Sequence, residues 1–310
     1  SALGYANIEN LSGNNSLNSN INIANGGGNG VNILSLAGTL TLTGDMSSGG
    51  TITGNRIYSF AGAGDTIATG TINNGIAGIS VNKENAGVLT LSGTNTYTGA
   101  TSINGGTISV DTINNGGVAG NLGASAATAT NLIFNNGTLK HTGASETSNR
   151  GFTITAGTTA TIDTTNILRL AGANGAATTG ALTKTGSGGL TLTGSNSNTG
   201  TTTISSGTLQ IGNGGATGAL SPSSTIVNNG TFSVFRSDNV VQGTQFSSAP
   251  ISGTGGFAHL STASVTLNVT NTYTGNTLVT QGTLVVTNPN FADTSTVTIG
   301  DFNASPAILN

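Results

Sequence analysis

Few side chains in this sequence could take part in catalysis or hold a metal ion. The 310 residues include 7 Lys and Arg, 10 Asp and Glu, 2 His and no Cys. A β-helix that cleaves polysaccharides needs clustered acidic residues for acid–base work or for a Ca²⁺ site, yet no two Asp residues are adjacent. His141 and His259 lie far apart in the sequence, and neither has another His or a Cys nearby. We therefore predict no catalytic residue, no cofactor site and no metal site.

The other charged residues share no motif, and we expect them on solvated faces. They are Lys83, Glu84, Lys140, His141, Glu146, Arg150, Asp163, Arg169, Lys184, Arg236 and Asp238. The serine-hydrolase motifs G-D-S-G and G-x-S-x-G are also missing from the sequence. We therefore predict that the chain is not an enzyme.

The charge and composition exclude several classes of partner. Charged residues make up 5% of the chain and the net charge is −3, with no basic cluster that could neutralise phosphates. We therefore expect no nucleic-acid partner. No run of 18 apolar residues occurs, so we expect no membrane insertion by this segment. The sequence starts without Met or a signal peptide, and we interpret it as a processed chain or a piece of a longer one.

The stretch 182–211 shows the strand pattern that organises the chain. Leu190 and Leu192 alternate with Thr residues before Gly194 ends the run, and two more short alternating runs follow before residue 211. Alternation with period 2 between turn residues predicts β-strands with one apolar face. Strands of about four residues are too short to form a stable sheet alone, so such units must stack on copies of themselves.

The copies are present, and glycine and asparagine mark the corners between strands. Residues 88–110 and 265–286 repeat the pattern, and residues 38–44 hold a partial copy. Asn-Asn-Gly tripeptides stand at 73–75, 114–116, 135–137 and 228–230, and the Gly-rich stretch 25–30 is expected to be a turn. Asn and Gly tolerate left-handed backbone angles. Stacked corners would let Asn side chains form hydrogen-bonded ladders.

These motifs resemble the autotransporter-associated β-strand repeat of bacterial autotransporter passenger domains. The match rests on G-x-L-T-L-[ST]-G-x-N-T-Y-T-G, seen at residues 87–99, and on the trailing G-T-L or its variants. The spacers NLGAS, FNNGTLKHTGAS and NRGFTITAGTTATID are also typical of that family. The resemblance implies a right-handed parallel β-helix on the surface of a Gram-negative bacterium. It implies no particular activity, because many passengers share this stalk.

The sequence therefore predicts an all-β fold: a single-stranded, right-handed parallel β-helix (solenoid) with three short strands per coil. We expect one continuous β-helix over residues 1–310, with a possible N-terminal cap at 1–37 and the clearest repeats at 79–110, 181–211 and 251–286. At about 21 to 25 residues per coil, roughly 13 coils would fit.

The favoured function is an extracellular structural rod, stalk or fibre subunit, adhesive and without catalysis. Its partners would be other copies of itself or the surface of a host or neighbouring cell. A specific binder of glycans or ice is the alternative, because Thr pairs such as Thr39/Thr41, Thr153/Thr155 and Thr191/Thr193 are expected to face outward on strands. A polysaccharide-cleaving β-helix enzyme is the third hypothesis. A binder would align Thr or aromatic residues over several coils, whereas an enzyme would bring three or more ionisable groups into one groove.

Overall fold

The computed structural model describes residues 6–24, 29–51, 54–287, 296–300 and 308–309. It confirms the predicted all-β parallel β-solenoid, with about 12 turns and no α-helix among these residues. The chain divides into two compact units, Ser1–Thr153 and Ile154–Asn310. The right-handed sense of the coil and the continuity of one β-helix over residues 1–310 stay predictions.

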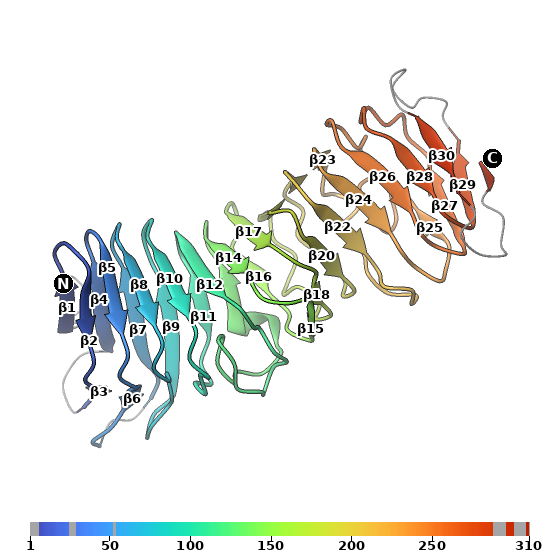
Figure 1. Ribbon diagram of the computed structural model, residues 1–310. Helices are drawn as coiled ribbons and strands as arrows, with labels where there is room; N and C mark the ends of the chain where they lie inside the picture. The colour runs from blue at the N-terminus through green and yellow to red at the C-terminus, as the bar shows by residue number, and fades with distance from the viewer. Residues whose placement is uncertain (1–5, 25–28, 52–53, 288–295, 301–307, 310) are drawn as a thin grey trace. The chain divides into compact units, whose positions relative to one another are not determined.

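The first unit is built on two stacks of parallel strands (Figure 1, blue to green). One stack runs in the order β1 (Ala6–Asn10), β4 (Gly30–Ser35), β7 (Arg56–Ala61), β9 (Ile79–Lys83), β11 (Thr101–Ile103) and β13 (Leu132–Phe134). The other runs β2 (Asn15–Leu17), β5 (Thr39–Leu42), β8 (Asp65–Ala68), β10 (Val88–Leu91), β12 (Thr107–Val110) and β14 (Thr138–His141). Strands β3 (Ile21–Ile23), β6 (Met46–Ser48) and β15 (Glu146–Ser148) lie on a third side, and the short 3₁₀ helix η1 covers Ala129–Asn131. Strand β16 covers Thr153–Ile154.

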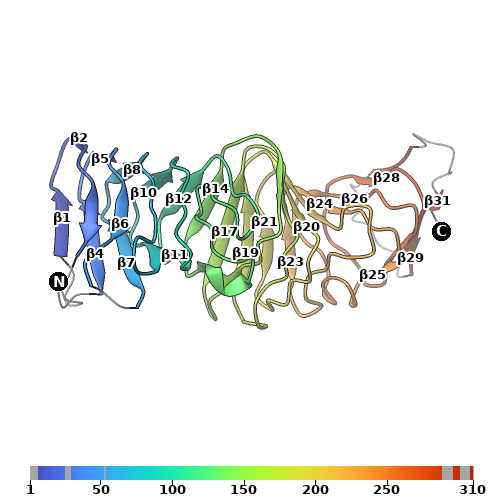
Figure 2. The same cartoon turned by 90° about the horizontal axis from the view of Figure 1, so that it is seen from below.

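The second unit has three stacks of the same kind, seen from a second direction in Figure 2. The first is β17 (Thr159–Thr164), β19 (Ala181–Thr185), β21 (Thr202–Ile204) and β23 (Ile226–Asn228). The second is β18 (Leu168–Leu170), β20 (Gly189–Leu192), β22 (Thr208–Ile211), β24 (Thr231–Val234), β26 (Gly256–His259), β28 (Thr277–Val279) and β30 (Val297–Ile299). The third is β25 (Val240–Val241), β27 (Ser264–Leu267), β29 (Thr283–Val286) and β31 (Ile308–Leu309).

The alternation of the sequence places the core inside the coil. In β22, Leu209 and Ile211 are fully buried, whereas Thr208 and Gln210 are half-buried on the outer face. Aromatic side chains also pack in the core, and Phe232 packs against Phe246 with ring centroids 5.3 Å apart. Because successive strand side chains point to opposite faces, this pattern is the direct result of the period-2 sequence.

The corners carry side-chain bonds from one turn to the next, as the Asn-rich tripeptides predict. Asn115 Oδ1 accepts a bond from the backbone N–H of Asn149 at 2.9 Å, and Asn149 Oδ1 accepts one from the N–H of Gly116 at 2.8 Å. Asn114 holds a φ of 55°, a left-handed angle that Asn tolerates better than most residues. Of the predicted Gly-rich turn at 25–30, residues 25–28 lie outside the described residues.

In each of the three repeats, the first two strands pair with the last two strands of the same repeat. In the first, Lys83 of β9 stands opposite Ile103 of β11, and Leu89 of β10 stands opposite Ile108 of β12. The second repeat pairs β19 with β21 and β20 with β22, and the third pairs β26 with β28 and β27 with β29. A single repeat therefore supplies two stacked layers of core, and equivalent residues of the three repeats can be compared directly.

Strands β1 to β3, within the expected N-terminal cap at 1–37, pair with β4 to β6 as an ordinary turn. Whether residues 1–37 act as a cap stays a prediction.

Candidate functional site

The expectation of solvated faces is wrong for five basic side chains. Lys83, His141, Arg150, Lys184 and Arg236 are buried, each with an exposed fraction of 6% or less. Backbone carbonyl groups or a carboxylate surround each of them, and such partners offset the cost of removing a charge from water. The other charged residues of that group are half-buried: Glu84, Lys140, Glu146, Asp163, Arg169 and Asp238.

Three buried basic residues occupy one register position in the three repeats. Lys83, Lys184 and His259 each stand five residues before an alternating run, which begins at Val88, Gly189 and Ser264 respectively. On the next turn they face Ile103, Ile204 and Val279 respectively. This equivalence is readable in the sequence once the repeats are superimposed, and it is the signal that would have identified the three buried groups.

The two lysines bond to the turn that follows their own strand. Lys83 Nζ donates to the carbonyls of Glu84 and Asn85, the latter at 3.0 Å. Lys184 Nζ donates to the carbonyls of Thr185 and Gly186, the latter at 3.0 Å. Burial lowers the pKa of each lysine to about 8, although nearby carboxylates oppose that shift. The ammonium groups therefore act as caps for corner carbonyls rather than as solvated charges.

His259 takes the same position in the third repeat as a neutral side chain. Its Nδ1 accepts a bond from the N–H of Ser261 at 3.4 Å. Burial lowers the pKa of His259 to about 4, and contacts with the backbone of Thr283 and Ala263 only partly offset this. At neutral pH the imidazole is therefore uncharged.

The N-T-Y-T-G motif holds a buried tyrosine in two of the repeats. Tyr97 and Thr101 join their hydroxyl groups at 2.7 Å, and Tyr273 and Thr277 do the same at 2.7 Å. Burial raises the pKa of both tyrosines to about 12. In the second repeat Asn198 replaces the tyrosine, so these rings lie in the core and offer no platform for stacking on sugars.

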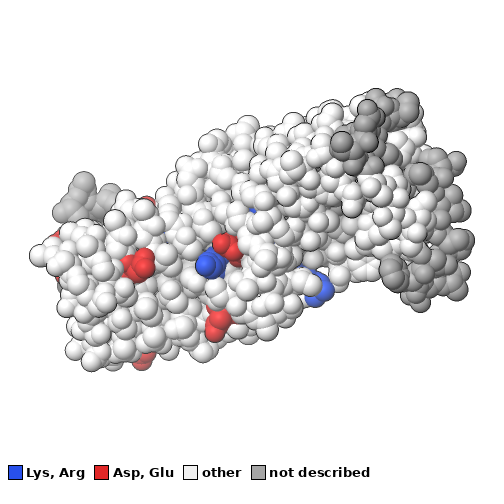
Figure 3. Space-filling model, turned by 45° about the horizontal axis from the view of Figure 1, so that its top comes forward, with Lys and Arg blue, Asp and Glu red and all other residues white. Residues whose placement is uncertain are grey.

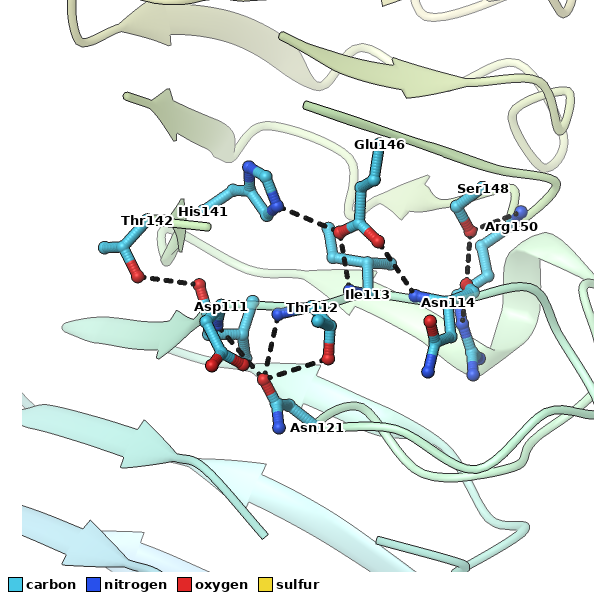
Figure 4. A network of polar contacts seen from close by, with 11 residues as sticks. Asp111, Thr112, Ile113, Asn114, Asn121, His141, Thr142, Glu146, Ser148 and Arg150 are labelled. Atoms are coloured by element: carbon cyan, nitrogen blue, oxygen red, sulfur yellow. Dashed lines mark hydrogen bonds and ion pairs between the residues drawn. The ribbon is translucent and has the colours of Figure 1, made fainter. Parts of the chain in front are cut away.

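A polar network in the first unit fixes the chain around residues 111–114 (Figure 4). Asn121 Oδ1 accepts bonds from the N–H groups of Asp111 at 3.1 Å and Thr112 at 3.0 Å. The Glu146 carboxylate accepts the N–H of Ile113 at 2.6 Å and that of Asn114 at 3.4 Å. Two side chains from other segments thus satisfy four backbone donors that have left the strand ladder.

Glu146 also meets His141 in this network, with Oε1 and Nε2 2.9 Å apart. Burial by itself raises the pKa of Glu146, but the hydrogen bonds from His141 and from the Ile113 N–H outweigh it and hold that pKa below its usual value. Both carboxylate oxygens are committed to protein donors. The pair therefore fixes the loop instead of presenting a free acid or base to a substrate.

One buried arginine in each unit holds a loop in place. Arg150 Nη2 donates to the carbonyl of Gly123 at 2.7 Å, and its Nη1 donates to Ser125 Oγ at 2.9 Å. In the second unit Arg236 Nη2 donates to the carbonyl of Ala216 at 2.8 Å and to Asp238 Oδ2 at 2.7 Å. The Arg236 guanidinium holds the pKa of the Asp238 carboxyl below its usual range. These arginine donors bond to groups of this same chain, so the contacts stabilise the loops and leave these donors unavailable to a ligand.

Hydroxyl-bearing residues do align on an outer face, but the alignment is interrupted. Across β5, β8, β10, β12 and β14 one column of paired residues reads Thr41, Ile67, Thr90, Ser109 and Lys140. The face shown in Figure 3 carries few charged side chains, and apart from one basic group that lies beside an acidic one they are scattered. A regular ice-matching Thr array is thus missing from this column.

The predicted outward position of Thr191 needs a correction. Thr191 lies on the expected face of its strand, because it pairs with Arg169 and Gln210 on the face opposite to the buried Leu192. However, Thr191 is only 4% exposed. The long Arg169 and Gln210 side chains on both neighbouring strands give a physical reason, since they shield a small residue between them.

A groove of about 390 Å³ crosses several turns of the second unit. Its polar lining consists of Ser195, Asn196, Ser197, Thr199, Ser221 and Thr244. Its apolar lining consists of Ala177, Ala219, Leu220 and Pro222. No ionisable residue lines it, so the groove lacks the convergent acids that a cleaving enzyme would need. Sequence reasoning predicted no site here, because the groove forms from small residues of separate turns.

Within the described ranges, no three His, Cys, Asp or Glu side chains gather as a possible metal site. No described helix has the length and hydropathy needed to cross a membrane.

Comparison with known proteins places the repeats in a family. The profile described as passenger-associated-transport-repeat matches residues 81–110, 182–211 and 262–286. The adhesin BmaC autotransporter of Brucella suis biovar 1 (strain 1330) is 43% identical over 136 residues, which are 43% of this chain and 4% of that protein. The chain thus spans a small fraction of that relative's length. No solved structure matches the chain.

The predicted resemblance to autotransporter passenger domains is therefore confirmed: the chain is a parallel β-solenoid that carries three passenger-associated transport repeats and is homologous over 136 residues to an autotransporter adhesin.

Proposed function

We propose that this chain is a non-catalytic, adhesive stalk segment of a passenger that a Gram-negative bacterium displays on its surface or secretes. The homology to an autotransporter adhesin carries this proposal. The fold supports it in a second way, because stacked repeats extend a chain at little cost in sequence complexity and expose long side faces for contact.

A lack of catalysis fits the chemistry of the described residues. The buried ionisable groups of the repeats, Lys83, Lys184 and His259, bond to or face their own backbone. The Glu146 carboxylate is likewise occupied by protein donors. We infer that these groups maintain the stalk, and that binding relies on the uncharged outer faces.

The partner is proposed to be the surface of a host or neighbouring cell. Adhesion of fluorescent beads that carry the 310-residue chain to cultured epithelial cells tests this. We expect more bound beads than with beads that carry equal mass of serum albumin, and we expect the soluble chain to compete. Equal binding of both bead types would contradict the adhesive role and leave a purely structural stalk.

Association of the chain with copies of itself stays a second proposal. Analytical ultracentrifugation over a hundredfold range of concentration tests it directly. A sedimentation coefficient that does not change over that range would contradict self-association.

A further inference from the structure

We propose that the groove of the second unit, lined by Ser195, Asn196 and Thr244 among others, binds a neutral saccharide. This inference rests on the proposed adhesive function, for which it names a ligand class and a site. A comparison of one asparagine among the three repeats is its starting point.

Asn196 has two register equivalents, Asn95 and Asn271, and all three are buried. Asn95 Oδ1 accepts the backbone N–H of Ile72 at 2.8 Å, and Asn271 Oδ1 accepts that of Ile251 at 2.8 Å. In both repeats the amide oxygen is therefore satisfied by the preceding turn of the solenoid.

Asn196 lacks that partner. Its Nδ2 donates to the carbonyls of Gly194 at 3.1 Å and Ala219 at 3.0 Å, while Oδ1 is buried without a hydrogen bond. The preceding turn is diverted here, because the N–H of Asn174 bonds to the carbonyl of Ser195 instead. Leaving a buried acceptor unsatisfied costs about 1–3 kcal/mol, so an opening of this turn that lets a ligand or water donate to Oδ1 is favoured.

The same asparagine lines the groove, and hydroxyl groups accompany it. Ser197 Oγ and Thr199 Oγ1 already donate to backbone carbonyls, at 3.1 and 3.2 Å, which leaves their oxygen lone pairs free to accept. No hydrogen bond occupies the hydroxyls of Ser195 and Thr244 among the described residues. The groove thus combines several acceptors with rotatable O–H donors, which suits a ligand rich in hydroxyl groups.

The remaining lining narrows the ligand class. Leu220 and Pro222 provide apolar surface for the C–H faces of a sugar ring, and no Lys or Arg is present to pair with a carboxylate, sulfate or phosphate. A volume of about 390 Å³ lies at the lower end of the roughly 300–1,000 Å³ typical of small-molecule sites. These features favour a short neutral saccharide over an acidic one.

Adjacent alanines offer a matched pair of variants for the test. Ala176 and Ala177 are both exposed, but only Ala177 lines the groove. Ala177→Tyr places a bulky ring at the groove, whereas Ala176→Tyr adds the same ring beside it. Thr244→Val removes one exposed hydroxyl at constant shape and serves as a second, gentler variant.

The measurement is a ¹H–¹⁵N NMR titration of the 310-residue chain with lactose, cellobiose and N,N′-diacetylchitobiose, with sialyllactose as the acidic comparison. We expect at least one neutral sugar to shift the Asn196 side-chain amide saturably in wild type and in Ala176→Tyr. We expect Ala177→Tyr to weaken this binding at least tenfold and Thr244→Val at least threefold.

The inference is overturned if no neutral sugar gives a saturable shift, if both tyrosine variants bind like wild type, or if sialyllactose alone binds. Bead adhesion to cells without sugar binding would remove this inference and keep the adhesive function. Sugar binding without bead adhesion would keep this inference and remove the adhesive function.

Discussion

Lys184 and Ile204 face each other on β19 and β21, so a buried ammonium group and an aliphatic side chain share one column of the core. Lys83 and Ile103 repeat the arrangement in the first unit. The lysine stem packs in the coil while Nζ reaches corner carbonyls. Because burial lowers the pKa of both lysines, the free energy of unfolding of the solenoid changes with pH in the alkaline range.

We expect the free energy of unfolding to rise between pH 7.5 and 9.5. The folded lysines have pKa values of about 8, against 10.5 for unfolded lysine. Between these values the unfolded chain holds more protons, so stability increases with pH. Urea unfolding at several pH values measures the rise. The Lys83→Met and Lys184→Met double variant should show little of it, and each single variant about half.

If the free energy of unfolding of wild type stays constant or falls over that interval, the lysines do not have the lowered pKa values that burial implies. Measurements should stop near pH 10, because Tyr97 and Tyr273 have raised pKa values of about 12. Above pH 10 unfolded tyrosines lose protons that the folded ones keep, so this second effect lowers stability as pH rises.

At acidic pH we expect His259 to weaken the third repeat. Its folded pKa is about 4, against 6.5 when unfolded. Between pH 6.5 and 4 the unfolded chain therefore binds more protons, and stability is lost as the pH falls. His259→Phe cannot take up this proton and should lose less stability between pH 6.5 and 5. If both proteins show the same slope in urea unfolding, protonation of His259 is not the cause.

Strand alternation could be predicted from the sequence because it follows local chemistry. Leu192 and Ile211 occupy the buried side that the period-2 pattern assigns, and Asn114 takes the left-handed angle expected of a corner. Repetition made the prediction safer, since each motif had to stack on copies of itself. These properties depend on neighbours in sequence or on one repeat period.

Burial of the charged groups could not be predicted in the same way. The Lys184 ammonium is held by corner carbonyls, and whether a corner turns toward the lysine depends on backbone angles rather than composition. Arg150 reaches the carbonyl of Gly123, which lies 27 positions earlier in the sequence. The groove beside Asn196 likewise depends on how the previous turn is diverted, which no local motif encodes.

Alternation itself can be tested on one strand. Ile204 is fully buried in β21, whereas its neighbour Thr203 is half-buried on the outer face. Ile204→Ala should cost about 2–5 kcal/mol of unfolding free energy, because it leaves a cavity in the core. Thr203→Ala should stay within about 0.5 kcal/mol. Chemical denaturation of both variants compares them, and equal losses would mean that the strand is buried on both faces.

The last prediction concerns the glycine that closes each repeat over its buried basic residue. Gly207 has a φ of 66°, and a Cβ added there would lie 2.3 Å from the carbonyl oxygen of Gly188. The left-handed angle alone costs a residue with a Cβ about 1–2 kcal/mol, and the overlap adds to it. Gly207→Ala should therefore destabilise the solenoid by more than about 1.5 kcal/mol in urea unfolding.

Gly215 provides the matched control in the same unit. It is exposed, has no positive φ, and a Cβ added there would meet no atom within 4 Å. Gly215→Ala should change stability by less than about 1 kcal/mol, and in the stabilising direction if the unfolded chain loses freedom. A loss of stability in both variants would point to a general intolerance of side chains at corners. A loss confined to Gly207→Ala would instead locate the constraint where the corner closes on the carbonyls that Lys184 caps.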